Sequence, residues 1–256
     1  MQLTIGWLYP ELMSTYGDRG NIAVLEKRCL WRSIQADVTP IDFSISDKEL
    51  KGVDLIFGGG AQDRQQGILI DDLRQKKGPI LKKMIDDGVP GLFVCGSPQL
   101  LGQYYMNAEG AKLEGLGILD MVSKHFGKDK PRCIGNLVAS LHSQFSIFNF
   151  PRNTVVGFEN HGGRTYLGQG VKPFATVLYG KGNNGEDGSE GAVYNNCIAT
   201  YSHGPFLPKN PHVADFLIQK SLEVKYGKEI VLDPLDDTLG WAAHDSIVKR
   251  FSVQKK

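Results

Sequence analysis

The 256-residue chain lacks any run of 18 or more apolar residues, so the sequence predicts no membrane-spanning helix. Its first nine residues have no basic segment and soon meet a polar residue, which is not typical of a secretory signal peptide. An excess of charge is also missing, because 29 basic and 28 acidic residues leave a formal net charge of +1. This balance argues against the electrostatic footprint of a nucleic-acid-binding protein.

Cysteine is scarce, and the spacings between Cys29, Cys95, Cys133 and Cys197 match no zinc-binding pattern. Without a signal peptide we expect a reducing compartment, in which these four residues are free thiols. The phosphate-binding pattern GxxxxGK[ST] is absent as well, so any ATP chemistry would have to take place on another chain. The length is ample for a conventional hydrophobic core.

The first hundred residues alternate between short apolar runs and amphipathic stretches. Ile22, Leu25 and Cys29 have the spacing of one helical face, which predicts a helix over 21–34. Strand and helix in turn at this pitch indicate a mostly parallel sheet with helices on both faces. The predicted strands are Leu3–Leu8, Ala36–Ile41, Val53–Phe57 and Gly91–Cys95, and a helical region rich in Gln and Lys, interrupted near Gly78, precedes the last of them.

The sequence pattern changes between about residues 113 and 201, where short β-prone runs are separated by Gly, Asn and Asp. We interpret these runs as strands and hairpins that extend the same sheet; they include Cys133–Ser140, Thr154–Phe158, Ala175–Tyr179 and Ile198–Tyr201. A helix is expected over 212–226 and a helical tail over about 237–256. No linker is evident, so we expect a single α/β domain over residues 1–256, built as a three-layer sandwich.

Cys95 ends an apolar strand and is followed at once by Gly96, Ser97 and Pro98. Serine then proline is a favourable N-cap and first-turn pair, so a helix is expected to begin there. Cys95 would then lie on a sharp strand-to-helix turn, as in the nucleophile elbow of hydrolases. Helix N–H groups would favour the reactive thiolate and could hold an oxyanion beside it. The alternative is a buried structural cysteine.

A thiolate nucleophile needs a base, and the chain has six histidines. His203 follows the strand 198–201, so it would lie at the carboxyl edge of the sheet, as Cys95 does. His161, in a glycine-rich loop, is the competing candidate. The other four are expected on helix surfaces (His212 and His244) or in polar surroundings (His125 and His142).

Gly58, Gly59 and Gly60 follow the strand 53–57 at the same predicted edge. Glycine lets the backbone approach a substrate closely, so this loop could give a second amide to an oxyanion. A plain tight turn is the alternative interpretation.

Together these residues resemble the class I glutamine amidotransferases, whose motif Cys-x-Gly-x-Gln stands here as CGSPQ over residues 95–99. The resemblance is greater to the cobyric-acid-synthase-like branch, and within it to the glutaminase subunits of lipid II isoglutaminyl synthases. GFENHGGRTY and HGPFLPKN are its most specific segments. It extends from about residue 16 to about residue 226 and includes Tyr16–Asn21, Phe57–Arg64, Glu114–Asp120, Gly157–Tyr166 and Thr200–Asn210.

The resemblance implies catalytic roles for five residues. Cys95 would attack the side-chain amide carbon of L-glutamine, and His203 would pass the proton to the departing ammonia. The backbone N–H of Gly96 and one from the loop of Gly58 and Gly60 would form the oxyanion hole. Neither a metal ion nor a cofactor is implied for this chain.

The resemblance also implies that Gln99 and Arg132 bind the substrate, with the Arg132 guanidinium on the α-carboxylate. A surface ion pair is the alternative for Arg132. The sequence departs from the family's pattern at two places. Ser97 stands where the motif has glycine, and the His-x-Glu ending is replaced by His203-Gly204-Pro205. We therefore hypothesise that a carboxylate of a partner chain orients His203.

Three functions remain open. The resemblance implies a glutaminase subunit that supplies ammonia to a MurT-type ATP-dependent ligase. That partner would hold ATP, Mg²⁺ and the lipid II acceptor, and would amidate the α-carboxyl of D-glutamate in peptidoglycan synthesis. A corrinoid carboxylate is the alternative acceptor, and a catalytically inactive interaction module is the third possibility. The resemblance implies a cytoplasmic location, at the inner face of the membrane.

Overall fold

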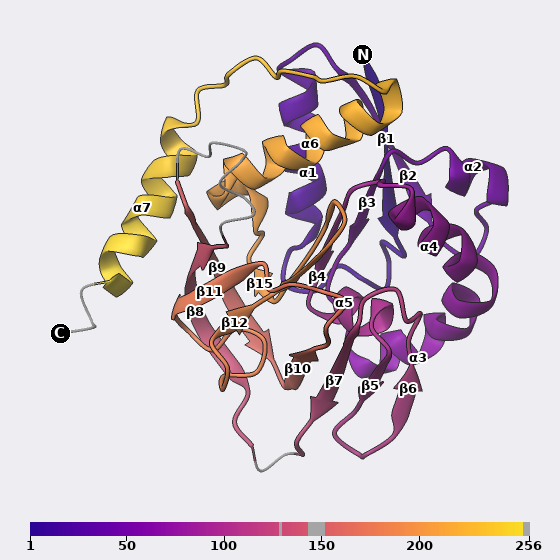
Figure 1. Ribbon diagram of the computed structural model, residues 1–256, viewed down its shortest axis with the longest axis vertical. Coiled ribbons are helices and arrows are strands. Elements are labelled where there is room, and N and C mark those ends of the chain that lie inside the picture. The colour runs from indigo at the N-terminus through magenta and orange to yellow at the C-terminus, as the bar shows by residue number, and fades with distance from the viewer. Residues whose placement is uncertain (128–129, 143–151, 253–256) are drawn as a thin grey trace.

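The computed structural model describes residues 1–127, 130–142 and 152–252, and a six-stranded sheet lies at its centre (Figure 1). The strand order is β13-β14-β4-β3-β1-β2, and every neighbouring pair is parallel except β13 and β14. The prediction of a mostly parallel α/β sheet is confirmed. The strands are β1 (Gln2–Leu8), β2 (Gln35–Ile41), β3 (Leu55–Gly58), β4 (Gly91–Val94), β13 (Ala192–Tyr194) and β14 (Cys197–Thr200).

Helices cover both faces of this sheet because its inner strands are apolar on both sides. Leu55 and Phe57 of β3 join a buried core with residues of α1 (Arg19–Leu30) and α6 (Pro211–Tyr226). Ile56, between them, belongs to a second core on the other face, with residues of α3 (Asp63–Asp72) and α4 (Gly78–Asp86). This alternation follows from the two-residue repeat of a strand.

The strands between residues 104 and 203 do not extend the central sheet as predicted, apart from β13 and β14. They form two further sheets, in the orders β10-β7-β5-β6 and β12-β11-β8-β9-β15. Local β-propensity cannot specify which strands pair. The strands are β5 (Tyr104–Met106), β6 (Lys112–Glu114), β7 (Met121–His125), β8 (Cys133–Leu141), β9 (Thr154–His161), β10 (Gly163–Leu167), β11 (Ala175–Tyr179), β12 (Ser189–Glu190) and β15 (Ser202–His203).

The third sheet packs into the same core as the central one, since Ala139 of β8, Val155 of β9 and Ala175 of β11 belong to the core beneath α1 and α6. The prediction of one domain over residues 1–256 stays a prediction. The remaining helices are α2 (Asp47–Lys51), a π-helix (Leu73–Lys77) that joins α3 to α4, α5 (Gly96–Leu101), a 3₁₀ helix (Leu207–Lys209) and α7 (Thr238–Ser252).

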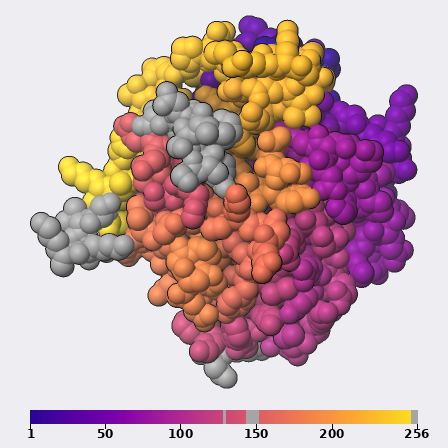
Figure 2. Space-filling view, viewed as in Figure 1, coloured from indigo at the N-terminus to yellow at the C-terminus, as the bar shows by residue number. Residues whose placement is uncertain are grey.

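Helix α7 packs against β8, β9 and β11, and the C-terminal segment, yellow in Figure 2, forms part of the outer surface. The predicted tail helix is therefore present as far as Ser252, and residues 253–256 lie outside the described part of the chain. The expectation that His212 and His244 lie on helix surfaces is wrong. Both are buried: Trp241 of α7 stacks on His212 with ring centroids 5.2 Å apart, and His244 lies within hydrogen-bond distance of the Thr154 hydroxyl and the Lys209 carbonyl. No helix in the described residues combines the length and apolarity that crossing a membrane requires.

Candidate active site

Cys95 lies on the turn between β4 and α5, with the strained backbone angles φ 54° and ψ −93°. A positive φ is costly for a residue with a side chain and persists only where the surroundings enforce it. Here the Cys95 N–H donates to the carbonyl of Thr200 at 2.9 Å, which ties the turn to β14. The half-buried Cys95 side chain faces a cavity of about 570 Å³. This geometry resembles the strand-to-helix elbow on which hydrolases carry their nucleophile.

Ser97, which replaces the glycine of the family motif, fits this elbow without strain of its own. It has no positive φ, and its hydroxyl donates to the carbonyl of Gly59 at 2.6 Å. A Cβ at Gly58 would lie 2.5 Å from the Ser97 hydroxyl, so glycine at 58 makes room for serine at 97. The extra side chain thus links the elbow to the glycine loop.

His203 lies close to Cys95 because the chain passes from the central sheet to the third sheet just before His203. The chain leaves the central sheet at the end of β14 and pairs with β9 as β15, two residues later. His203 is 1% exposed, and the ring of Tyr16 covers it edge-on with centroids 5.0 Å apart. Burial alone lowers the pKa of His203, but the negative charge of Cys95 and the hydrogen bond to Asp18 outweigh it and raise the pKa to about 10. This favours the protonated imidazolium form of His203 at neutral pH.

The carboxylate that orients His203 comes from the same chain. Asp18 Oδ1 lies 3.1 Å from His203 Nδ1, and the Asp18 side chain is completely buried. The hypothesis of a partner-chain carboxylate is therefore wrong. Sequence reasoning missed Asp18 because it precedes His203 by 185 residues. The available signal was its place in the motif segment Tyr16–Asn21.

Asp18 also bears on the oxyanion hole, because its Oδ2 accepts the N–H of Gly60 at 2.7 Å. The Gly60 amide is thus already engaged in this structure. The next residue, Ala61, lines the cavity, and its N–H makes no hydrogen bond to any of the described residues. A Cβ at Gly96 would lie 2.6 Å from the Ala61 nitrogen, so the two backbones approach closely beside Cys95. Roles for Gly96, Gly58 and Gly60 at an oxyanion stay predictions.

Gln99 lies in the wall of the cavity and both ends of its amide are held. Its Oε1 accepts from Gln66 Nε2 at 2.8 Å, and its Nε2 donates to the Tyr201 hydroxyl at 3.2 Å. The Tyr201 hydroxyl in turn lies 2.6 Å from the hydroxyl of Thr165. Gln99 is therefore a rigid wall residue.

Arg132 reaches the same cavity from the start of the third sheet. Its Nε and Nη2 both donate to Asn160 Oδ1 at 3.1 Å, and Nη2 also donates to the Asn160 carbonyl at 3.0 Å. The structure thus brings Cys95, Gln99 and Arg132 to one cavity, with the guanidinium fixed in direction. Its Nε and Nη2 are engaged by Asn160, and the role of Arg132 in binding the α-carboxylate stays a prediction.

His161, the competing candidate for the base, also lies in the cavity wall, but its surroundings favour the neutral ring. Its Nδ1 hydrogen-bonds to the Gly163 carbonyl at 2.7 Å, its Nε2 is 4.0 Å from Glu159, and its ring stacks on Tyr201. Burial lowers the pKa of His161 to about 3. A ring with so low a pKa is a poor acceptor for a thiol proton at neutral pH. His203, whose protonated form is stabilised by Cys95 and by the hydrogen bond to Asp18, is therefore the better candidate for the group that exchanges a proton with Cys95.

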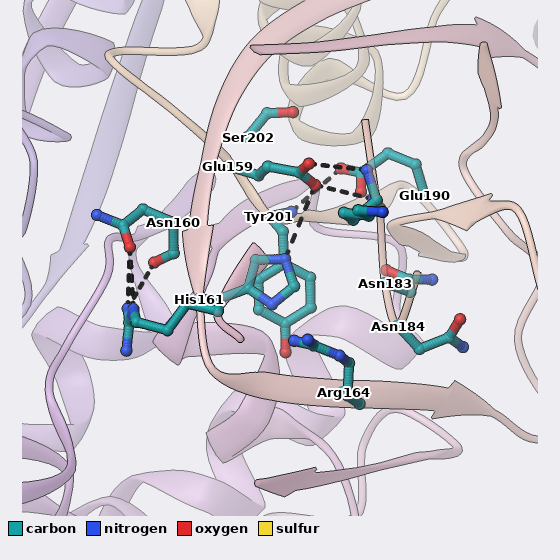
Figure 3. A network of polar contacts seen from close by, with 12 residues as sticks. Glu159, Asn160, His161, Arg164, Asn183, Asn184, Glu190, Tyr201 and Ser202 are labelled. Atoms are coloured by element: carbon teal, nitrogen blue, oxygen red, sulfur yellow. Dashed lines mark hydrogen bonds and ion pairs between the residues drawn. The ribbon is translucent and has the colours of Figure 1, made fainter. Parts of the chain in front are cut away.

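Two buried carboxylates behind the site were missed by sequence reasoning (Figure 3). Glu159 accepts the N–H groups of Lys181 and Gly182 at 2.7 and 2.8 Å. Glu190 accepts from the Thr200 hydroxyl at 2.5 Å and from the Tyr201 N–H at 3.1 Å. Burial raises the pKa of Glu190 to about 7. Glu190 thus holds the segment in which the chain changes sheets before His203.

Comparison with known proteins agrees with this geometry. Residues 4–211 match the CobB/CobQ-like glutamine amidotransferase domain. The chain is 41% identical to the Streptococcus pneumoniae protein named lipid II isoglutaminyl synthase (glutamine-hydrolyzing) subunit GatD, over 93% of this chain and 87% of that protein. It is 38% identical to the Staphylococcus aureus protein of the same name, over 100% and 98%. A glutamine amidotransferase structure from Thermotoga maritima has the same fold, with a TM-score of 0.54 and 13% identity over 99% of this chain and 97% of that one.

Proposed function

The chain belongs to the CobB/CobQ-like glutamine amidotransferase family, and we propose that it is the glutaminase subunit of a lipid II isoglutaminyl synthase. The observation that carries this proposal is the arrangement of Cys95 on a strained elbow, open to a cavity and beside the buried pair of His203 and Asp18. A catalytically inactive module would have no need for either the strain or the buried charges.

The proposed reaction begins with attack of Cys95 Sγ on the side-chain amide carbon of L-glutamine. The carbonyl oxygen becomes an oxyanion, which the Gly96 N–H and a second amide of the glycine loop stabilise. His203 gives its proton to the amide nitrogen, the carbon–nitrogen bond breaks, and ammonia leaves. The product is a γ-glutamyl thioester on Cys95.

Water then attacks the thioester. His203 takes a proton from the water and returns it to the sulfur as glutamate leaves, so the enzyme is restored. Asp18 holds the imidazole in the tautomer that keeps its Nε2 directed to the reacting atoms. Arg132 binds the α-carboxylate of the substrate, and Gln99 forms a fixed wall.

The ammonia would be consumed on a partner. Both named relatives are subunits of a synthase, which implies a partner subunit. We propose a MurT-type ligase that activates the α-carboxyl of D-glutamate in lipid II with ATP and Mg²⁺, at the inner face of the membrane. Free ammonia is largely protonated at neutral pH and then not nucleophilic, which favours direct transfer over release.

A corrinoid carboxylate is the second candidate acceptor, because the matched family is named for CobB and CobQ. The test is to purify the chain with its co-expressed ligase and supply L-glutamine, ATP and either lipid II or a corrinoid acid. We expect amidated lipid II, and we expect Cys95→Ser to abolish glutamine-dependent amidation while added ammonium salts still support it. Amidation of the corrinoid alone would contradict the proposal.

A further inference from the structure

The cavity beside Cys95 has an uneven charge distribution. Of the described residues that line it, Asp63 is the one with a carboxylate, whereas Arg64, Lys130 and Arg132 are cationic. L-Glutamine carries an α-carboxylate and an α-ammonium group, and a site for the free amino acid has to compensate both charges. The cations match the carboxylate. The ammonium group needs an anionic partner in the same cavity.

Asp63 is placed on the wall by two features. It is the first residue of α3, three residues after Gly60 of the glycine loop, and its Oδ1 accepts from the Tyr105 hydroxyl at 3.1 Å. Its Oδ2 accepts no hydrogen bond from the side chains or loop amides of the described residues. The carboxylate is thus held by one oxygen and open at the other.

Tyr105 connects Asp63 with the reacting centre. Burial and then the negative charge of Asp63 raise the pKa of Tyr105, and the charge of Cys95 adds to this effect. The phenol therefore stays protonated and can keep donating to Asp63. Because Tyr105 lines the cavity together with Cys95 and Asp63, the open carboxylate oxygen belongs to the site in which the amide is cleaved.

We propose that Asp63 binds the α-ammonium group of L-glutamine and makes this site select the free amino acid over glutamine analogues that lack that charge. The inference rests on the proposed function, since it takes glutamine as the substrate. An ammonium group has three donors and no acceptor, which suits a carboxylate with an open oxygen. N-acylated glutamine, including glutamine within a peptide, would present a neutral amide to Asp63 and be rejected.

The test compares two substrates that differ only at this group: L-glutamine and 4-carbamoylbutanoate, which lacks the α-amino group. Ammonia release is measured for the wild-type complex and for Asp63→Asn. We expect Asp63→Asn to raise the KM for L-glutamine by about 10- to 100-fold with little change in kcat, as for loss of a charged hydrogen bond. The KM for 4-carbamoylbutanoate should change less than threefold, so the preference for glutamine collapses.

Asp71→Asn is the matched control, because Asp71 is an exposed acid on the same helix that does not line the cavity. It should leave both substrates unchanged. Equal loss for both substrates in Asp63→Asn, or an unchanged KM for glutamine, would overturn the inference. The Kd of L-glutamine can also be measured in the inactive Cys95→Ala variant, with and without Asp63→Asn. Asp63→Asn should raise this Kd as it raises the KM, and no turnover is needed for the comparison. If the wild-type complex releases no ammonia from glutamine, the proposed function itself fails, which is a distinct result.

Discussion

Asp18 and His203, 185 residues apart, are joined by a completely buried hydrogen bond of 3.1 Å between Oδ1 and Nδ1. The other oxygen of Asp18 accepts the N–H of Gly60. One carboxylate therefore sets both the orientation of the base and the conformation of the glycine loop. This completes a Cys–His–carboxylate arrangement within a single chain, although the carboxylate does not follow the histidine in sequence.

Asp18→Asn should lower kcat for glutamine hydrolysis by about 10²- to 10⁴-fold, because the amide no longer stabilises the imidazolium or holds its tautomer. KM should change little, since Asp18 is buried and does not line the cavity. Steady-state ammonia release by the ligase complex is the measurement, with Glu26→Gln on the surface of α1 as the control. Activity near the wild-type level would show that the bond between Asp18 and His203 has no catalytic role.

His203→Ala should lower the rate of glutamine hydrolysis far more than His161→Ala does. Removing His203 takes away the group that exchanges protons with the sulfur and with the leaving ammonia, so hydrolysis should fall by about 10²- to 10⁴-fold. His161→Ala removes a neutral buried ring and should cost far less in kcat. The ratio of the two rates at pH 7.5 decides between the bases, and a greater loss for His161→Ala would reverse the assignment.

We expect Glu190 to position His203 indirectly, by holding the backbone segment that precedes it. Its Oε1 holds the Thr200 hydroxyl and the Tyr201 N–H, and the Thr200 hydroxyl accepts the N–H of Ser202 at 3.0 Å. Glu190→Leu removes these contacts and should lower kcat by about 10²-fold, as small misplacements of catalytic groups do. Glu190→Gln keeps an acceptor oxygen and should retain activity within about tenfold.

The control for Glu190 is Glu186→Gln, an exposed residue of the preceding loop. Thermal unfolding should be recorded for each variant, because a role in stability alone would lower the melting temperature without changing kcat. If Glu190→Leu folds and retains the wild-type kcat, Glu190 does not position the base.

His212 should make the protein sensitive to acid. Burial lowers its pKa to about 3, whereas the unfolded chain titrates near pH 6.5. The unfolded state therefore binds more protons than the folded state at any pH between these values. The stabilising contribution is fully present above about pH 6.5 and declines by about 1.4 kcal/mol per pH unit below it.

Urea unfolding at pH 7.5 and pH 5.0 tests this expectation. Between pH 7.5 and pH 5.0 the free energy of unfolding should change less favourably for the wild-type chain than for His212→Phe, because only the wild type carries the buried His212 ring. His142→Gln is the control, because His142 is not deeply buried. An identical pH dependence in wild type and His212→Phe would contradict the account.

The sequence alone was enough to predict the strand-to-helix elbow at Cys95 and the class of fold. An apolar strand, Cys95 and a serine–proline helix start are contiguous, so short-range chemistry was enough to predict the elbow. The pairing of strands between residues 104 and 203, the burial of His212 and His244, and the carboxylate on His203 were decided only by the tertiary structure. Each depends on segments distant in sequence, and no local propensity encodes which distant segment supplies the missing partner. Asp18 was visible as part of a motif, but only the packing of α1 against the end of the sheet brings its charge to the histidine.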